Sequence, residues 1–576
     1  MKFAEALTQA LVELKVKHVF GVSGANIEYL HDAIHRNTQL SSVLAKTEIG
    51  AAYMADASAR SKGKLAVCCS TSGAGMMNLL VGLAESYAEN VPILAIVGQM
   101  DSSLNGKGGF QDSSALSGNV DGFKLLSACT KSVINLTDTT NFWDDFSWLI
   151  TQALTGQPGP VALMVPREIF QSDIMPLPSH WIDDIPDPLS LNPPAEYEVT
   201  ELLAMLTKAN KPLLIMGAQA SRSPSLEHIQ AFAERTKLPV ATSMSGKGAY
   251  DHFAINFIGN NGIAGHESVN TWVQQADLII VAGCRLDVMN RGHVLDAAKS
   301  GTRVIAINIS PPFELNSLEN LCYFNSEPGQ FFEQVMHQID GANSLYTGQY
   351  PSLIPFPFKP VNIDPTFSDG LSFSLAMKAI NPFIDIGDQI FIDAGNTGAT
   401  ALHYLQLPQD SQSHIALGMG GMGYSFAAAI GHQISNPTHD HTLVFAGDGS
   451  FLMGGLEIHG AIERQLPILF FIFNDAGHGM CKTRQRVFFN NRFEAVAYPE
   501  LDISRLVSGL AEPTQLFCRQ VCTEQELVAA MTLFKAGNVP TGVIEIKINR
   551  EEWPPFTTLP SIQTNNDTEQ KLANPI

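Results

Sequence analysis

The chain has 576 residues, of which 45% are hydrophobic and 16% are charged. This length is too great for one hydrophobic core, and the ordinary composition excludes a disordered or fibrous protein. With 35 basic and 56 acidic residues the net charge is -21, which argues against nucleic acid and anionic membranes as partners.

The amino-terminal stretch MKFAEALTQALVELKVKHVF carries acidic residues within its apolar pattern and has no small-residue cleavage site. No apolar run reaches the length that spans a membrane. We therefore expect a cytoplasmic protein. The eight cysteines have no paired CxxC spacing, and we expect them to be buried free thiols.

Short apolar strands alternate with amphipathic helices along the chain, which is the pattern of parallel α/β sheets. Helices are predicted over 3–14, 48–60 and 75–89, and strands over 18–22, 41–45, 64–70 and 92–98. The same pattern predicts strands over 212–217, 277–283 and 303–309, and then over 389–395, 442–449 and 467–475. Each group of strands indicates one doubly wound sheet.

Two proline-rich stretches, 172–196 and 340–366, interrupt this alternation and are typical of linkers. The predicted fold class is therefore α/β, with three tandem doubly wound parallel-sheet domains. We place them at 1–172, 192–340 and 366–552, followed by a tail at 553–576. The periodicity does not say what these domains bind.

The segment Gly447-Asp448-Gly449-Ser450 follows an apolar strand, and a second apolar strand ends directly before Asp475. Ligands of open α/β sheets sit outside the carboxyl ends of the strands, so Asp448 and Asp475 are expected to share one crevice. Carboxylate oxygens are suitable ligands for a hard cation such as Mg²⁺, and a glycine-flanked helix start can bind the phosphate group that shares the cation. Taken alone, the tetrapeptide would be read as a tight turn.

The segment Lys46-Thr47-Glu48-Ile49-Gly50 joins a predicted strand to a predicted helix. Glu48 is a candidate catalytic acid, since a carboxyl group beside a ring nitrogen can drive acid-base chemistry on a cofactor. A glutamate that only stabilises a helix start is the alternative.

The collinear stretches HVFGVSGANIEYLHDAI, KTEIGAAYMADASAR, STSGAGMMNLLVGLAESYAENVPILAIVGQ, GKGGFQD, QPGPVALMVPREI, GMGGMGYSFAAAIG and GDGS cover most of the chain. In order and spacing they resemble the thiamine-diphosphate-dependent enzymes of the acetolactate synthase and pyruvate decarboxylase-like family. The resemblance implies a pyrimidine-binding, a central and a diphosphate-binding domain, with thiamine diphosphate and Mg²⁺ as cofactors.

The resemblance also implies roles for individual residues. Glu48 would be hydrogen-bonded to the aminopyrimidine and promote formation of the thiazolium ylid. The metal ligands would be Asp448, the side chain of Asp475 and the backbone carbonyl of Gly477. The family usually has two asparagines where this chain has Asn474-Asp475.

Further cofactor contacts follow from the same resemblance. Met422 would be the wedge that holds the two cofactor rings in a V shape, and the Gly420 carbonyl would accept a hydrogen bond from the 4'-amino group. Met422 as ordinary core filler is the alternative. The other implied cofactor-binding residues are Thr71, Asn78, Gly447, Gly449, Ser450, His478 and Met480.

The substrate side of the site is implied by three short segments. Gly24 and Ala25 resemble the turn opposite the thiazolium, and Phe110 with Gln111 resembles a pair beside the bound intermediate. Gly24, Ala25 and Gln111 are therefore catalytic candidates, whereas Asn26, Phe110 and Arg484 are candidate substrate contacts. Arg484 stands where branched-chain enzymes carry a tryptophan, and a cation there favours a polar acceptor unless it is merely solvated.

Biosynthetic members of the family bind FAD through two arginines, and this chain has Gln157 and Met289 in their places. We therefore expect no FAD. The predicted function is a carboligase that decarboxylates a 2-oxo acid such as pyruvate and adds the acyl carbanion to a second carbonyl compound. The alternatives are a decarboxylase or acyloin or diketone lyase, and a binding protein that lost the chemistry. The resemblance implies a homodimer or homotetramer.

Overall fold

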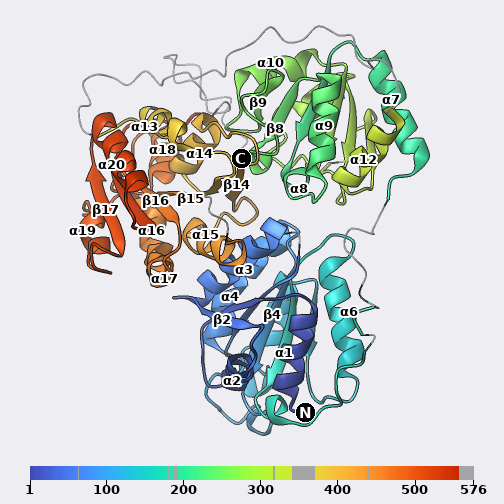
Figure 1. The fold of residues 1–576 in the computed structure, drawn as a ribbon, viewed down its shortest axis with the longest axis vertical. Helices are drawn as coiled ribbons and strands as arrows, with labels where there is room; N and C mark the ends of the chain where they lie inside the picture. The colour runs from blue at the N-terminus through green and yellow to red at the C-terminus, as the bar shows by residue number, and fades with distance from the viewer. Residues whose placement is uncertain are drawn as a thin grey trace.

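The computed structural model describes residues 1–62, 64–179, 181–183, 185, 193–314, 318–339, 370–437 and 441–556. In these residues three parallel six-stranded sheets follow one another along the chain, each flanked by helices (Figure 1). The predicted α/β fold class is confirmed. The linker predicted over 340–366 lies outside the described residues, as do parts of the linker over 172–196 and the tail from 557 onward, so the exact domain boundaries stay a prediction.

The N-terminal domain has the strand order β2-β1-β3-β4-β6-β5. Its strands are β1 (His18–Gly21), β2 (Ser41–Leu44), β3 (Ala66–Ser70), β4 (Ile93–Gln99), β5 (Ser132–Asn135) and β6 (Val161–Pro166). Its helices are α1 (Phe3–Glu13), α2 (Glu28–Arg36), α3 (Glu48–Lys62), α4 (Ala74–Ala88), α5 (Gly122–Cys129) and α6 (Phe142–Leu154). The order reverses direction between β1 and β3, which makes the carboxyl ends of these two strands the expected place for a ligand.

The central domain has the strand order β12-β11-β10-β7-β8-β9. Its strands are β7 (Pro212–Met216), β8 (Val240–Ser243), β9 (Phe257–Asn261), β10 (Leu278–Ala282), β11 (Arg303–Ile307) and β12 (Leu321–Phe324). Its helices are α7 (Glu196–Lys208), α8 (Ala218–Ser221), α9 (Leu226–Thr236), α10 (Glu267–Gln275), α11 (Val294–Lys299) and α12 (Pro328–Ile339). This order is shared with dinucleotide-binding folds, but a shared fold does not establish a ligand.

The C-terminal domain repeats the topology of the first one, with the order β14-β13-β15-β16-β18-β17. Its strands are β13 (Gln389–Ile392), β14 (Gln412–Ile415), β15 (Thr442–Gly447), β16 (Ile468–Asn474), β17 (Leu516–Val521) and β18 (Thr541–Lys547). Its helices are α13 (Phe373–Ile380), α14 (Asn396–Tyr404), α15 (Tyr424–Ser435), α16 (Asp448–Gly454), α17 (Ile458–Glu463), α18 (Gly479–Phe488), α19 (Ile503–Ser508) and α20 (Glu524–Ala536), and the short helix η8 (Gly455–Glu457) links α16 to α17. The switch point lies between β13 and β15.

The first and third domains share one hydrophobic core, although they are far apart in the sequence. Helix α15 lies along α3 in Figure 1, and the rings of Tyr53 on α3 and Tyr424 on α15 meet edge to face with their centres 5.1 Å apart. A Cβ atom on Gly431 would lie 2.3 Å from the backbone oxygen of Met54, so only glycine permits this approach. The contact fixes the two domains against each other.

A buried ion network ties all three domains together. Arg60 on α3 pairs with Asp56 at 2.5 Å and with Glu85 at 3.4 Å, and its exposed fraction is only 4%. Nearby, Arg222 of the central domain pairs with Glu89 at 3.2 Å. On the other side, Glu85 accepts hydrogen bonds from backbone N–H groups of the C-terminal domain, at residues 418 and 419.

We expect Arg60→Ala to lower the free energy of unfolding by about 3 to 5 kcal/mol, because it leaves Asp56 and Glu85 buried without their cation. Urea denaturation followed by tryptophan fluorescence measures this loss. Arg36→Ala is the matched control, since it removes only exposed ion pairs and should cost about 0 to 1 kcal/mol. Equal losses in the two variants would contradict the role assigned to the network.

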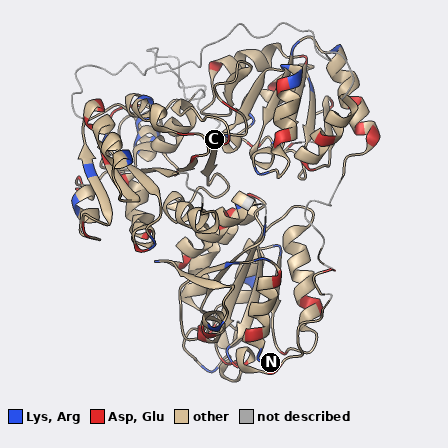
Figure 2. Ribbon diagram, viewed as in Figure 1, with Lys and Arg blue, Asp and Glu red and all other residues tan. Residues whose placement is uncertain are grey.

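Acidic and basic residues occur in all three domains (Figure 2), and over the whole chain the acidic residues are in excess. Among the described residues, no helix is both long and apolar enough to cross a bilayer. The expectation of buried thiols is correct for Cys68, Cys69 and Cys284, but it is wrong for Cys481 and Cys522, which are exposed. Both exposed cysteines lie outside the apolar strand interiors on which the expectation was based.

Candidate active site

Glu48 is the first residue of α3, at the edge of the N-terminal sheet where the carboxyl ends of the strands meet. The Thr47 hydroxyl accepts a hydrogen bond from the Gly50 N–H at 2.9 Å and so caps the helix. The Glu48 carboxylate accepts a hydrogen bond from Asn78 on α4 at 3.0 Å. Two residues singled out in the sequence, Glu48 and Asn78, are thus brought together.

Thr71 follows β3 directly, beside the turn that follows β1, which is the switch point of this sheet. Its hydroxyl donates to Gln111 at 3.3 Å, and the Asn26 N–H lies 3.4 Å from the same oxygen. A Cβ atom on Gly24 would lie 2.8 Å from the Thr71 side chain, so glycine is required for this close packing. Gln111 adopts a φ of 65°, a strained backbone of the kind found at functional sites.

Two residues predicted near the substrate are open to solvent in the single chain. Phe110 is 84% exposed, and Ala25 is exposed as well. In contrast, Asn26 is buried and donates from its side chain to the Ser72 hydroxyl at 2.8 Å. We refer to Glu48, Thr71, Asn78 and Gln111 with the Gly24 turn as the N-terminal half-site.

Asp448 and Asp475 meet at the carboxyl edge of the C-terminal sheet. Strands β15 and β16 are neighbours, and each ends directly before one of the two aspartates. The Gly477 N–H donates to the Asp448 carboxylate at 3.2 Å. Burial and then the adjacent Asp448 carboxylate raise the pKa of Asp475 to about 8, and burial raises the pKa of Asp448.

The buried Asp448 and the half-buried Asp475 fit a divalent cation, because a positive charge between them would offset the burial that raises both pKa values and the repulsion that further raises the pKa of Asp475. The backbone around them is shaped for a close ligand. A Cβ atom on Gly479 would lie 2.3 Å from the Asp475 carboxylate, and one on Gly449 would lie 2.8 Å from the His478 ring. Glycines at both positions therefore keep the crevice open.

The loop that precedes α15 brings Met422 to the same crevice. Gly420 and Gly423 adopt φ values of 68° and 86°, which let the loop turn twice around Met422. The end of the Met422 side chain lies 3.3 Å from the position of a Cβ atom on Gly449. We call Asp448, Asp475, Met422 and His478 with their glycines the C-terminal half-site.

Three other predicted residues lie around this half-site. The Ser450 hydroxyl donates to Asp393 at 2.8 Å, so it is engaged within the protein. Met480 is partly buried against the core of the domain. The guanidinium of Arg484 is exposed and lies 5.6 Å from the Phe488 ring centre. Among the described residues, no carboxylate forms an ion pair with it.

Two residues that the sequence motifs did not predict, Asp393 and Asn396, follow β13 at the switch point of the C-terminal sheet. Asp393 accepts hydrogen bonds from the Gly423 N–H at 3.0 Å and from Ser450, so it joins the Met422 loop to the start of α16. Among the described residues, the buried side-chain amide oxygen of Asn396 has no hydrogen-bond partner. The signal for both was the predicted strand over 389–395, which contains Asp393 and ends directly before Asn396.

The two half-sites are separate within one chain. Glu48 is bonded inside the N-terminal domain, whereas Asp448 is bonded inside the C-terminal domain. No hydrogen bond or ion pair of the described residues joins Glu48 to Asp448 or Asp475.

Comparison with known families accounts for this bipartite arrangement. Residues 1–117 match the N-terminal TPP binding domain of thiamine pyrophosphate enzymes, residues 199–318 match their central domain, and residues 393–544 match their C-terminal TPP binding domain. The chain belongs to the thiamine pyrophosphate enzymes. The two half-sites lie in the two domains whose family descriptions include binding of thiamine pyrophosphate.

Similar curated proteins place this thiamine pyrophosphate enzyme beside the acetolactate synthases. The acetolactate synthase large subunit of Cyanidium caldarium is 28% identical over 520 residues, which cover 85% of this chain and 84% of that protein. The acetolactate synthase isozyme 2 large subunit of Escherichia coli K12 is 26% identical over 595 residues, and all of both chains is covered. The family resemblance seen in the sequence is thereby confirmed.

The central domain of this thiamine pyrophosphate enzyme uses its residues for contacts between domains. Met289 packs against the hydrophobic core of the C-terminal domain. Arg285 donates to the backbone oxygen of Ala88 in the N-terminal domain at 2.6 Å, and its guanidinium lies 5.3 Å from the Phe313 ring centre. Gln157 is exposed at the end of the N-terminal domain.

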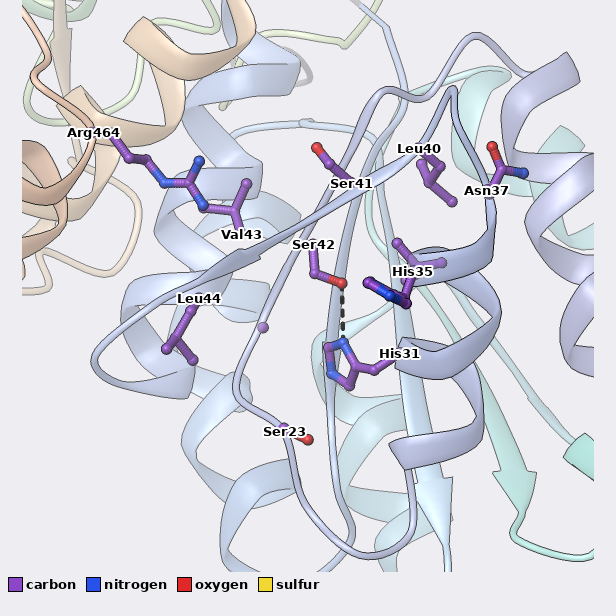
Figure 3. Close-up of a pocket in the computed structure, with 12 residues that line it drawn as sticks. Ser23, His31, His35, Asn37, Leu40, Ser41, Ser42, Val43, Leu44 and Arg464 are labelled. Carbon is purple, nitrogen blue, oxygen red and sulfur yellow. Dashed lines mark hydrogen bonds between the residues drawn. The ribbon is translucent and has the colours of Figure 1, made fainter.

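A cavity of about 560 Å³ lies along the edge strand β2 rather than in either half-site. Figure 3 shows His31 of α2 bonded to Ser42, with Arg464 of the C-terminal domain at the rim. Neither Glu48 nor Asp448 lines this cavity.

Proposed function

We propose that this enzyme is an acetolactate synthase-like carboligase, which decarboxylates pyruvate or a related 2-oxo acid and adds the acyl group to a second carbonyl compound. The observation that carries the proposal is the pair of adjacent carboxylates, the buried Asp448 and the half-buried Asp475, in a chain that also holds Glu48 at the start of a helix in its N-terminal domain. Both relatives named above are called acetolactate synthases, which supports the same reaction.

The C-terminal half-site would hold the metal and the diphosphate. Asp448, the Asp475 side chain and the Gly477 carbonyl would coordinate Mg²⁺, in keeping with its preference for oxygen ligands. The amides at the start of α16 would face phosphate oxygens, since helix N-termini favour anions. Thiamine diphosphate, once bound, supplies the nucleophilic carbon and the electron sink for decarboxylation.

Glu48 would hold and move a proton in the N-terminal half-site. Asn78 donates to one carboxylate oxygen, which orients the group and leaves it the other oxygen for a ring nitrogen of the cofactor. Met422 would support the cofactor from below, and the Gly420 carbonyl would accept a hydrogen bond from its amino group. These assignments follow the family motif residue by residue.

The remaining candidates would surround the substrates. Gly24, Ala25 and Gln111 would line the reacting side, with Asn26 and Phe110 nearby. Arg484 is a free cation in the described chain and would bind a carboxylate of the acceptor, because a guanidinium recognises that group with two parallel hydrogen bonds. Several of these residues are exposed in the single chain, so another protein surface would have to cover them to exclude water from the reaction.

A second subunit would supply that surface. The two half-sites are separate within one chain and Phe110 is exposed, so the N-terminal half-site of one subunit would face the C-terminal half-site of another. A homodimer is then the smallest active unit, and a tetramer would contain two such pairs.

Product analysis tests the proposal. The enzyme with thiamine diphosphate and Mg²⁺ would be incubated with pyruvate alone and with a panel of 2-oxo acids and aldehydes, and products identified by mass spectrometry. We expect a coupled hydroxyketone or acetohydroxy acid. Free aldehyde as the main product would identify a decarboxylase or lyase instead, and the absence of turnover with every donor would reject the carboligase.

We also predict that the purified protein carries no FAD, because Gln157 and Met289 replace two arginines that would pair with the dinucleotide. Arg285 is already engaged with the N-terminal domain and offers no substitute. The flavin content is measured after the protein has been denatured, from the visible absorption bands of the released flavin. A near-stoichiometric yellow cofactor would overturn this prediction.

A further inference from the structure

Glu457 reaches from the C-terminal domain to the helix start that carries Glu48. Its carboxylate accepts hydrogen bonds from the Lys46 N–H at 3.1 Å and from the Thr47 N–H and hydroxyl at 3.0 Å. It is 3% exposed. A buried carboxylate with several donors from one short segment holds that segment in a single arrangement.

The neighbouring residues are shaped around this contact. A Cβ atom on Gly50 would lie 2.2 Å from the Glu457 carboxylate, so glycine at that position is required for the approach. Thr47 is shared, because its hydroxyl donates to Glu457 and accepts from the Gly50 N–H. The first turn of α3, and Glu48 with it, therefore depends on Glu457.

Glu457 also lies close to the C-terminal half-site in sequence. Asp448 is the first residue of α16, and Glu457 ends the short helix η8 that follows without a break. One short helical segment therefore carries a predicted metal ligand at one end and the anchor of the Glu48 turn at the other. Asp448 and Glu457 are nine positions apart in the sequence.

We propose that Glu457 is a positioning residue that sets the orientation of the Glu48 carboxyl by holding the backbone of the Lys46–Thr47 turn. The inference rests on the proposed function of Glu48.

The first test uses the full chain without cofactor. Amide hydrogen exchange, measured by mass spectrometry on the peptide around residues 44–52, reports the Lys46 and Thr47 hydrogen bonds directly. We expect exchange about tenfold faster in Glu457→Gln, since a bond to a charged acceptor is lost. Glu463→Gln is the matched control, because it removes only the exposed pair with the Lys46 ammonium group. Unchanged exchange in Glu457→Gln would overturn the proposal.

The second test uses the enzyme with thiamine diphosphate and Mg²⁺. We expect Glu457→Gln to slow hydrogen-deuterium exchange at C2 of the cofactor by about tenfold or more, within the range of acid-base contributions, while the cofactor Kd changes less than about twofold. Glu463→Gln should behave as wild type. If amide exchange in residues 44–52 were faster but C2 exchange of the cofactor were normal, Glu457 would only stabilise the contact between the domains. That result would overturn the proposal.

Thr47 variants keep the inference testable if Glu457→Gln fails to fold. Thr47→Ala removes one donor to Glu457 and should slow C2 exchange, whereas Thr47→Ser keeps the hydroxyl and should restore it. Equal rates of C2 exchange in Thr47→Ala and Thr47→Ser would count against the proposed positioning of Glu48. A failure of the proposed function looks different, since the wild-type enzyme itself would then show no cofactor-dependent C2 exchange.

Discussion

Glu48→Gln should reduce turnover by about 10²- to 10⁴-fold, the usual contribution of general acid-base catalysis. Glutamine keeps the size of the side chain and can still accept a hydrogen bond from Asn78, but it cannot pass a proton to the ring nitrogen. Thiamine diphosphate should still bind. Steady-state turnover and hydrogen-deuterium exchange at C2 of the bound cofactor measure the two consequences.

The alternative role of Glu48 makes the opposite forecast. If Glu48 only stabilises the start of α3, glutamine should cost about 1 kcal/mol or less of folding stability and leave turnover nearly intact. Glu28→Gln at the start of α2 is a matched control, because Glu28 occupies the same place on another helix of this domain. Wild-type C2 exchange in Glu48→Gln would remove Glu48 from the mechanism.

Asp448→Ala should abolish stabilisation by thiamine diphosphate with Mg²⁺. A ligand at a hundredfold excess over its Kd raises the free energy of unfolding by about 2.7 kcal/mol, and the wild-type melting temperature should rise accordingly. Without ligands the variant should melt near the wild type, because removal of Asp448 also relieves the buried Asp475. Differential scanning calorimetry with and without the two ligands measures both effects.

Asp475→Asn separates ligation from charge. An amide oxygen can still coordinate Mg²⁺, and asparagine does not suffer the repulsion that raises the pKa of Asp475. We therefore expect the ligand-induced stabilisation to persist in this variant. A full shift in Asp448→Ala, or an unchanged melting temperature for the wild-type protein with both ligands, would rule out the metal assignment.

The meeting of Asp448 and Asp475 could be predicted because each follows a long apolar strand, and such strands are recognisable from composition alone. Asp393 was missed for a different reason. It also follows a predicted strand, but only the order of the strands shows that this end lies at the switch point beside β15. The order is set by packing over the whole sheet and leaves no local trace.

Several other strands were also missed. Strand β17 mixes buried and exposed residues irregularly and gives no clear period, whereas β6 and β18 are buried along almost their whole length and lack the alternation that marks a half-buried strand. The Glu457 contact joins positions 411 residues apart, and no spacing in the sequence marks it. Interdomain contacts of this kind depend on how finished domains fit together, which the pattern of one segment does not encode.

The shared core of α3 and α15 has a consequence for synthesis of the chain. Helix α3 leaves the ribosome about 360 residues before α15 is complete, and the whole central domain is made in between. At 5 to 20 residues per second this interval lasts roughly 20 to 70 s. Throughout it the side of α3 that carries Tyr53 and Met54 has no α15 to pack against, so the nascent N-terminal domain exposes apolar surface of the kind that chaperones bind.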